Sequence, residues 1–242
     1  MSIEVTVVIA GVGLLIGMAK GGFGPVLGAL ATPILSQVMP VSQAVATALP
    51  LLMIGDVFAL RLYWNQWNFR QLQLLIPSAV LGVFLGAYLL TTLPDTLLRP
   101  TLGLFSLLIV AYKLVSDRLS VQSYRPHNWH GYVAGGASGF GSAVANAGGP
   151  PFTAYMLLQK LDPAIFMGTT TLFFITVNLI KLPSFWLAGL MDDTPILTIL
   201  VMLPVVFVGS AVGRHFVKRV NPKMFETVMM VLLILASTLL FI

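Results

Sequence analysis

The sequence predicts an all-α polytopic membrane protein made of two inverted repeats, each a broken re-entrant helical hairpin followed by three transmembrane helices. Three observations lead to this prediction: the apolar composition, two interrupted apolar segments, and a series of matches between the two halves of the chain. Of the 242 residues, 57% are hydrophobic and 9% are charged, and the mean hydropathy is +0.95. Because soluble domains carry roughly 25% charged residues, a soluble enzyme or binding module is excluded.

Six apolar stretches are long enough to cross a hydrocarbon core of about 30 Å, which takes about 20 helical residues. We expect these spans at about 44–62, 71–92, 97–115, 164–187, 195–217 and 223–242. Two further apolar stretches, at about 3–36 and 129–158, are interrupted by glycine and proline. Lipid cannot satisfy the backbone groups that such breaks release, so we expect both breaks to be buried in protein or to line a watery cavity.

An ordered series of matches relates the two halves. The motif Pro77-x4-Gly82-x3-Gly86 recurs as Pro204-x4-Gly209-x3-Gly213, at a constant offset of 127 residues (204−77). Two single prolines recur at similar offsets, Pro25 as Pro150 and Pro40 as Pro163. Such a series indicates internal duplication, which is common among transporters. We place the first repeat at 1–118, a basic cytoplasmic linker at 119–128 and the second repeat at 129–242.

The basic residues decide whether each broken segment is a kinked span or a hairpin. Apart from Lys20 and Lys181, the 13 Lys and Arg residues lie in loops or near segment ends. If all eight segments crossed, these residues would divide 5:6 between the two sides, whereas two re-entrant segments give 10:1, with Arg99 alone on one side. Lys and Arg collect in cytoplasmic loops, so two hairpins are favoured. Each half then crosses three times, the halves are inverted, and both termini face outside.

The tips of the two hairpins are the leading candidates for a binding site. Each tip has a proline, in Gly24-Pro25 and Gly149-Pro150, where a second half-helix should begin. Proline suits the first turn of a helix, and helix N-termini attract anions through free N–H groups and partial positive charge. The alternative is that these glycines only permit close packing of helices in the membrane.

Four polar residues inside apolar segments are further candidates. Lys20 lies at the first break, Asp56 lies deep within a predicted span, and Asn178 and Lys181 share a helix face. A charge at mid-bilayer costs about 2.5–3.5 kcal/mol or more, so each of these charges needs a task or a partner. The alternatives are snorkelling for Lys20, an interhelical hydrogen bond for Asn178 and Lys181, and an ion pair with Arg61 or a lysine for Asp56.

Threonines near the start of the second span of each half are weaker candidates. Thr47, Thr169 and Thr170 could offer hydroxyl groups to an anion, although most threonines in membrane helices bond to their own backbone. The sequence lacks motifs typical of enzymes that make or break covalent bonds: it has no cysteine, no phosphate-binding loop and no His-Glu-x-x-His pair. We therefore expect no enzyme activity, no catalytic residue, no metal site and no cofactor.

The motifs at the breaks carry a family resemblance. The run Gly-Gly-Phe-Gly-Pro25 precedes Ala46-Thr47, and Asn146-Ala-Gly-Gly-Pro150 precedes Gly168-Thr169-Thr170 and Asn178-x-x-Lys181-x-Pro183. The chain resembles the TauE/SafE family of sulfite and organosulfonate transporters over about residues 5–241. It departs from many members by carrying Lys20 before a shorter glycine run. The resemblance implies export or uptake of small sulfur-containing anions by a multi-pass protein of the bacterial inner membrane.

The resemblance and the residues together give a functional hypothesis. We expect a secondary transporter in which a sulfite or organosulfonate anion binds between the tips, and in which the two halves rock about that site. The expected binding residues, which lie at the breaks and on the spans that follow them, are Lys20, Gly22, Gly24, Pro25, Thr47, Asn146, Gly148, Gly149, Pro150, Thr169, Thr170, Asn178 and Lys181. The N–H groups that follow Gly24 and Gly149 are expected donors, and Asp56 is the candidate group for coupling to protons or sodium.

Two alternatives from other classes remain open. An anion channel would share a basic pore lined by helix ends, and a membrane-embedded enzyme or assembly factor would need a reactive cluster that the sequence lacks. The expected partners are the small anion, membrane lipid, a coupling proton or sodium ion and, as a further candidate, a second copy of the chain. No nucleic-acid partner is expected, because the basic residues are those of cytoplasmic loops.

Overall fold

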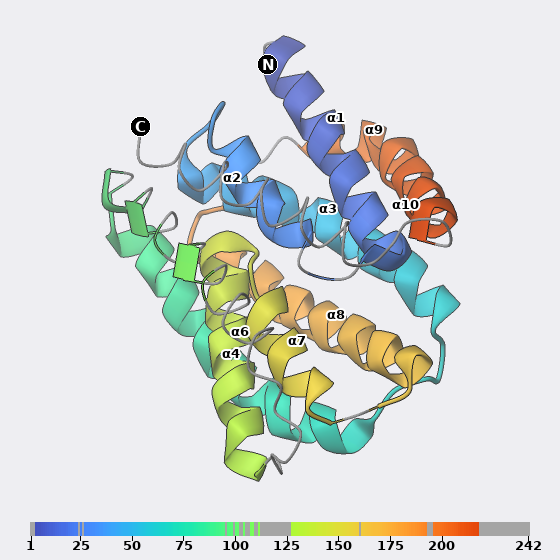
Figure 1. The fold of residues 1–242 in the computed structure, drawn as a ribbon. Coiled ribbons are helices and arrows are strands. Elements are labelled where there is room, and N and C mark those ends of the chain that lie inside the picture. Colours follow the sequence, from blue (N-terminus) through green and yellow to red (C-terminus); the bar gives the residue numbers. More distant parts are fainter. Residues whose placement is uncertain are drawn as a thin grey trace.

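The computed structural model describes residues 3–23, 25, 27–94, 127–159, 161–192 and 196–217, together with a few single positions between 96 and 111. These residues form helices joined by turns, and none of them lies in a strand (Figure 1). Within them, four helical segments are long and apolar enough to cross a membrane: Ile3–Gly21, Val41–Leu62, Phe69–Thr92 and Ile165–Leu187. The predicted all-α, polytopic class is therefore confirmed.

The first broken segment changes its helix type at the break. Helix α1 (Ile3–Met18) continues into a π-helical turn, η1 (Ala19–Phe23), at the Lys-Gly-Gly run. A 3-10 turn, η2 (Leu27–Leu30), and the short helix α2 (Ala31–Leu35) follow, and α2 packs back against α1. The half-helix expected to begin at Pro25 therefore begins two residues later and as a 3-10 turn, while Gly24 lies outside the described residues.

The second broken segment is two α-helices that lie side by side and run in opposite directions (Figure 1). Helix α6 (Asn128–Ala145) ends at Asn146, whose backbone is left-handed with φ 54°. The backbone N–H of Ala147 donates to the carbonyl of Gly141 at 2.9 Å and that of Asn146 to Ser142 at 3.0 Å, so backbone bonds close the end of the helix around this left-handed residue. Helix α7 (Gly149–Leu157) then begins with two prolines in its first turn, where a missing N–H does no harm.

Three long helices cover stretches where spans were expected. They are α3 (Val41–Leu62), α4 (Phe69–Thr92) and α8 (Pro163–Leu187). The expected span at 195–217 is instead two helices, α9 (Ile196–Val201) and α10 (Leu203–Val217). Pro204 explains the break, because its ring lacks an N–H and collides with the preceding turn. The expected span at 223–242 and most of the 119–128 linker lie outside the described residues, and the span at 97–115 is described only at isolated positions.

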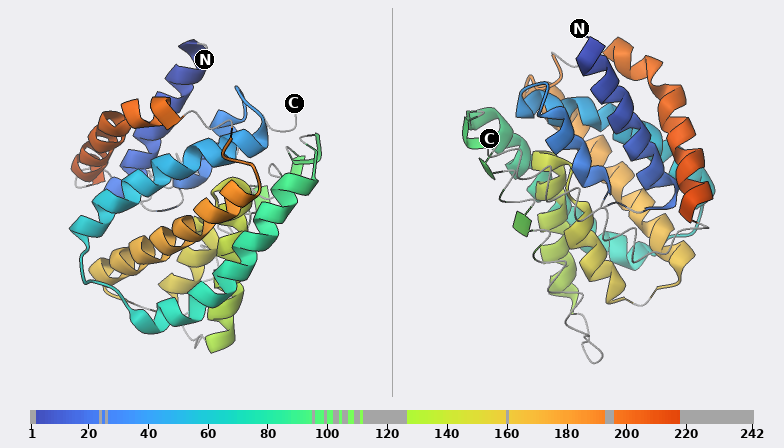
Figure 2. Two further views of the ribbon diagram at one scale, coloured as in Figure 1. Left: turned by 180° about the vertical axis from the view of Figure 1, so that it is seen from behind. Right: turned by 45° about the horizontal axis from the view of Figure 1, so that its top comes forward.

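The long helices form three layers. Helices α3 and α8 lie side by side in the middle, antiparallel to each other, with α1 and α10 on one flank and α4, α6 and α7 on the other (Figures 1 and 2). Glycines bring the flanking helices into backbone contact. A Cβ on Gly17 of α1 would overlap the carbonyl oxygen of Val206 on α10, and a Cβ on Gly139 of α6 would overlap that of Ala79 on α4. Small residues of this kind allow close helix packing in membranes.

The end of α7 lies on the same side of the molecule as the loop between α3 and α4. The side-chain nitrogen Nε2 of Gln71, on the first turn of α4, donates to Oε1 of Gln159 at 3.1 Å. The backbone N–H of Asn68 donates to the hydroxyl of Thr169, near the start of α8, at 2.9 Å. The start of α6 lies along this same edge (Figure 1), so the chain enters α6 and leaves α7 on one side of the molecule.

Candidate functional site

The two breaks meet in the interior. Gly149, at the start of α7, lies against Pro25: a Cβ on Gly149 would come within 2.7 Å of the Pro25 carbonyl oxygen. A cavity of about 20 Å³ lies beside this contact, which is room for about one water molecule. Its lining draws on both breaks and on the two central helices, and includes Lys20, Pro25, Leu52, Ser142, Asn146, Gly149, Phe174 and Asn178.

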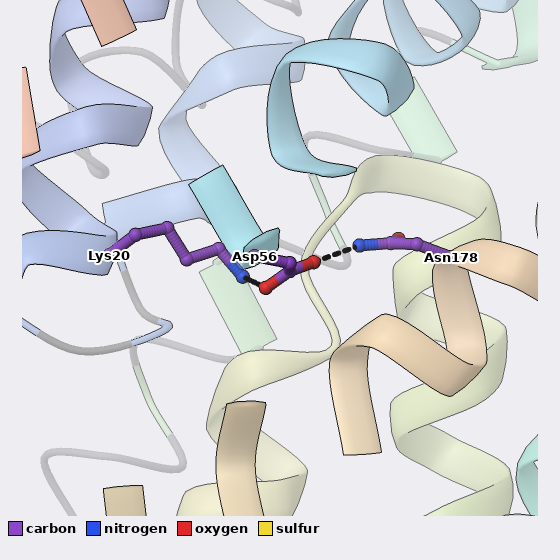
Figure 3. Close-up of polar contacts among 3 residues, drawn as sticks. All are labelled: Lys20, Asp56 and Asn178. Atoms are coloured by element: carbon purple, nitrogen blue, oxygen red, sulfur yellow. Dashed lines mark hydrogen bonds and ion pairs between the residues drawn. The ribbon is translucent and has the colours of Figure 1, made fainter. Parts of the chain in front are cut away.

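An ion pair joins the first break to α3. The ammonium group of Lys20 on η1 contacts Oδ1 of Asp56 on α3 (Figure 3). The other carboxylate oxygen, Oδ2, accepts a hydrogen bond of 2.7 Å from the side-chain amide of Asn178 on α8. Asp56 is only 1% exposed, whereas the Lys20 side chain is 13% exposed. The lysine therefore joins a buried carboxylate to the cavity.

A second contact joins the second break to α8. The ammonium group of Lys181 donates to Oδ1 of Asn146 at 2.5 Å. The amide nitrogen of Asn146 donates in turn to the hydroxyl of Thr32 at 3.0 Å and to the carbonyl of Val45 at 3.2 Å. Lys181 is fully buried, with its nitrogen 5.4 Å from the centroid of the Phe185 ring. Both ends of the Asn146 amide are thus used to fix the break against its neighbours.

Together Lys20, Asp56, Asn146, Asn178 and Lys181 form what we call the central polar cluster. It contains two ammonium groups and one carboxylate. Lys20 is paired with the carboxylate, while Lys181 contacts a neutral amide and an aromatic ring. With both lysines protonated, the cluster has an excess of one positive charge. Of the two ammonium groups, that of Lys20 lines the adjoining cavity and that of Lys181 does not, so Lys20 is the group with which an anion in the cavity could pair.

The three expected threonines either bond to their own helix or lie away from the cavity. The hydroxyl of Thr169 donates to the carbonyl of Ile165 at 2.6 Å, and that of Thr170 donates to Phe166 at 2.8 Å. Both follow the backbone-bonding alternative. Thr47 is buried on α3 with a hydroxyl that finds no hydrogen-bond partner in the described part of the chain, and it does not line the cavity.

The glycines and prolines of the breaks support the site mainly by their shape. Gly148 lies against Ser138, whose hydroxyl donates to the Gly148 carbonyl at 2.6 Å. Gly22 lies within η1. The residues after Gly149 are Pro150 and Pro151, which have no N–H. The expected amide donors after Gly149 are therefore absent, and the first turn of α7 retains N–H groups only at Gly148 and Gly149.

Sequence reasoning missed three residues that contact the cluster: Thr32, Phe174 and Phe185. Phe174 lies under the Lys20 nitrogen, 5.5 Å from it, and Phe185 under Lys181. Both aromatic residues had a signal in the sequence, because Phe174 precedes Asn178 by four residues and Phe185 follows Lys181 by four, the spacing that shares a helix face. Thr32 had none, since its contact with Asn146 joins residues 114 positions apart.

Comparison with known proteins gives one match. A family model described as "Sulfite exporter TauE/SafE" matches residues 9–240, nearly the whole chain. No curated protein and no solved structure matches the chain.

Proposed function

Since the chain belongs to the sulfite exporter TauE/SafE family of membrane transporters, we propose that it carries sulfite or organosulfonate anions across the bacterial inner membrane by alternating access. The observation that supports this most strongly is the central polar cluster. It is buried, it has two lysines for one carboxylate, and it lies where the two breaks meet beside a cavity. The anion would bind in this cavity, with Lys20 as its principal partner.

The chemistry of the cavity suits a sulfur oxyanion. A sulfonate or sulfite group has several oxygens that accept charge-assisted hydrogen bonds, which are stronger than neutral ones. Lys20 and Asn178 bring an ammonium group and a side-chain amide to the cavity lining, whereas both N–H groups of the Asn146 amide already donate to Thr32 and Val45. A space of about 20 Å³ is smaller than any of these anions, so binding requires the cavity to open. A closed site of this kind supports a carrier over an open channel.

Matching contacts in the two halves support the proposal that the halves are inverted copies. Gly17 contacts Val206, and Gly139 contacts Ala79, in each case glycine against a carbonyl oxygen. The two glycines, Gly17 and Gly139, lie 122 residues apart (139−17). The two residues that they contact, Ala79 and Val206, lie 127 residues apart (206−79). Gly209 against Leu14 and Gly82 against Gly136 repeat these two spacings. The interface between α1 and α10 therefore corresponds to that between α4 and α6.

This packing suggests which parts move. The first helix of each half packs on the third long helix of the other half, through glycine contacts that leave no room for sliding. We therefore propose that α1 with α10 and α4 with α6 are the moving bodies, in place of the two sequence halves. They would move about the antiparallel pair α3 and α8, which carries Asp56, Asn178 and Lys181.

The proposed topology places both termini outside and the end of α7 in the cytoplasm. Since the chain has no native cysteine, single cysteines at Asp162 and at Trp64, in the loop between α3 and α4, can be labelled in intact cells. Both should react only after the membrane is permeabilised. A cysteine at 162 that reacts from outside would refute the double hairpin.

Transport itself is tested in proteoliposomes with radiolabelled sulfite and with a radiolabelled alkyl sulfonate. Lys20→Met and Lys181→Met each remove one charged donor, worth about 1.5–3 kcal/mol, so uptake at low substrate should fall roughly tenfold or more. Asp192→Asn, at an exposed position outside the cluster, is the control and should transport normally. Normal uptake by both lysine variants would remove the cluster from the mechanism, and flux that does not saturate would indicate a channel.

A further inference from the structure

Lys20 already has an anionic partner. Its ammonium group contacts Oδ1 of Asp56, and it also lines the cavity where the substrate is proposed to bind (Figure 3). Asp56 lies behind it, 1% exposed, and does not line the cavity. A substrate anion and the carboxylate would therefore compete for one ammonium group in a site with little water, where two like charges on the same partner repel strongly.

The amide of Asn178 has an unused acceptor next to this carboxylate. Its nitrogen donates to Oδ2 of Asp56 at 2.7 Å, but its own oxygen, Oδ1, is buried and has no hydrogen-bond partner among the residues that the structure describes. Buried acceptors are usually paired, so an unpaired one requires an explanation. A neutral Asp56 would supply the missing donor, because a carboxylic acid and an amide can pair through two hydrogen bonds.

Duplicate positions meet at this point with different charges. Asp56 and Asn178 lie 122 residues apart, the spacing that also relates Gly17 to Gly139 (139−17). Lys20 and Ser142 (142−20) and Leu52 and Phe174 (174−52) share this spacing, and all four line the cavity. The first half supplies a lysine and a carboxylate where the second half supplies a serine and an amide.

We propose that in the empty carrier the Asp56 carboxylate pairs with Lys20 in the position that the substrate anion takes when it binds. The anion replaces the carboxylate there as Asp56 takes up one proton. The anion replaces Oδ1 of Asp56 as the partner of Lys20. The proton, taken from the aqueous side, binds to Oδ1, and the resulting O–H donates to Oδ1 of Asn178. This inference rests on the proposed function and specifies its coupling ion.

The charge balance supports the exchange. A monovalent anion and a proton enter together, so the charge of the central polar cluster is the same before and after binding. In the empty state the ion pair neutralises Lys20, and the carrier can reorient without an unpaired charge at that position, which would be costly in the membrane.

The described charged groups around Asp56 are few. Of those on the elements packed against α3, Lys20 of η1 and Lys181 of α8 interact with the carboxylate. Glu4 of α1 and His215 of α10 are exposed, and His130 is bonded to His127 at the start of α6. Helices α2 and α9 carry no titratable side chain.

The test is calorimetric titration of the purified protein with methanesulfonate, an anion that stays monovalent at neutral pH. Comparing buffers of different ionisation enthalpy gives the number of protons taken up. The wild type should take up close to one proton per anion, and its affinity should fall about tenfold for each unit of rising pH. Asp56→Asn should take up none, should lose the pH dependence, and should bind at least as tightly as the wild type at alkaline pH.

Asp192→Asn makes the same chemical change at an exposed carboxylate and should behave as the wild type. Binding without proton uptake in the wild type, proton uptake that survives Asp56→Asn, or a dependence on sodium in place of pH would each overturn the exchange while leaving the proposed function intact. Failure of the wild type to bind both methanesulfonate and sulfite would overturn both.

A second measurement avoids the variant altogether. In protein labelled with 13C at the aspartate carboxyl groups, infrared difference spectra on adding methanesulfonate should show a carboxylate band replaced by that of a protonated carboxyl group. Unchanged carboxylate bands on anion binding would contradict the proposal even if Asp56→Asn does not fold.

Discussion

The two breaks reach the same cavity with different chemistry. The first passes through a π-helical turn and brings a charged side chain, Lys20, which pairs with Asp56. The second ends a helix in a left-handed residue, Asn146, whose neutral amide bonds to Thr32, Val45 and Lys181. The first break is thus built around a charge, and the second around a fixed backbone shape.

Because of this difference, substitutions at the two breaks can distinguish the effect of charge from the effect of a fixed backbone shape. An ammonium group on a flexible stem can change partners, whereas an amide with both ends bonded, on a residue that closes a helix in the left-handed conformation, cannot move without losing several hydrogen bonds. We therefore expect changes at the second break to lower stability most, and changes at the first break to affect anion transport more than folding. Four substitutions test this, in order of their expected effect on the free energy of unfolding.

Asn146→Ala should have the largest effect. It leaves the buried Lys181 ammonium without its hydrogen-bond partner, and a hydrogen bond to a charged group contributes about 1.5–3 kcal/mol. The left-handed backbone conformation also costs alanine about 1–2 kcal/mol of folding free energy. Asn146→Gly loses the same amide but tolerates that backbone, so its thermal unfolding midpoint in detergent should lie above that of the alanine variant. Equal midpoints would show that the left-handed conformation contributes nothing.

Gly149→Ala should come next, because it adds a methyl group 2.7 Å from the Pro25 carbonyl oxygen. Overpacking of this kind costs about 1–3 kcal/mol, and it also pushes the two breaks apart, so transport should fall. The matched control is Gly11→Ala on α1, where a Cβ would meet nothing within 4 Å. A Gly149→Ala protein as stable and active as this control would mean that the breaks need not touch.

Lys20→Met should destabilise the fold less, by about 1 kcal/mol, while abolishing most anion transport. The loss is small because Asp56 keeps its bond to Asn178 and can take up a proton in place of its lost cation. Unfolding midpoints and sulfite uptake, measured on the same preparation, separate the two effects. A Lys20→Met protein less stable than Asn146→Ala would reverse the comparison between the breaks.

Thr170→Val should have the smallest effect, within about 0.5 kcal/mol, with unchanged uptake. The hydroxyl of Thr170 bonds only within its own helix, to Phe166, so its loss leaves no group at the cavity unpaired. Thr47→Val, which removes a buried hydroxyl without a hydrogen-bond partner among the described residues, should be neutral or slightly stabilising. A marked loss of sulfite uptake in either variant would restore the threonines as substrate ligands.

Much of the site was visible in the sequence because polar residues in apolar segments are rare and expensive. Lys20, Asp56, Asn178 and Lys181 stood out for that reason, and Asn146 stood out through the motif at the second break; all five belong to one cluster. Their pairing was only partly visible: the sequence offered Arg61 or a lysine as the partner of Asp56, and the structure shows that the partner is a lysine, Lys20, 36 residues away. Threonine hydroxyls also look alike in a sequence, whether they bond to their own helix or face a cavity.

The helical class, the spans that α3, α4 and α8 occupy and the positions of the breaks followed from the sequence alone, since they depend on composition and on residues close together in the chain. The tertiary structure decided which residues pair, which helices pack together and where the cavity lies. Asp56 bonds to Asn178 across 122 residues, and α1 packs on α10 of the other half. Contacts of this kind arise only when the whole chain is packed, because each depends on the position of every helix between its two partners.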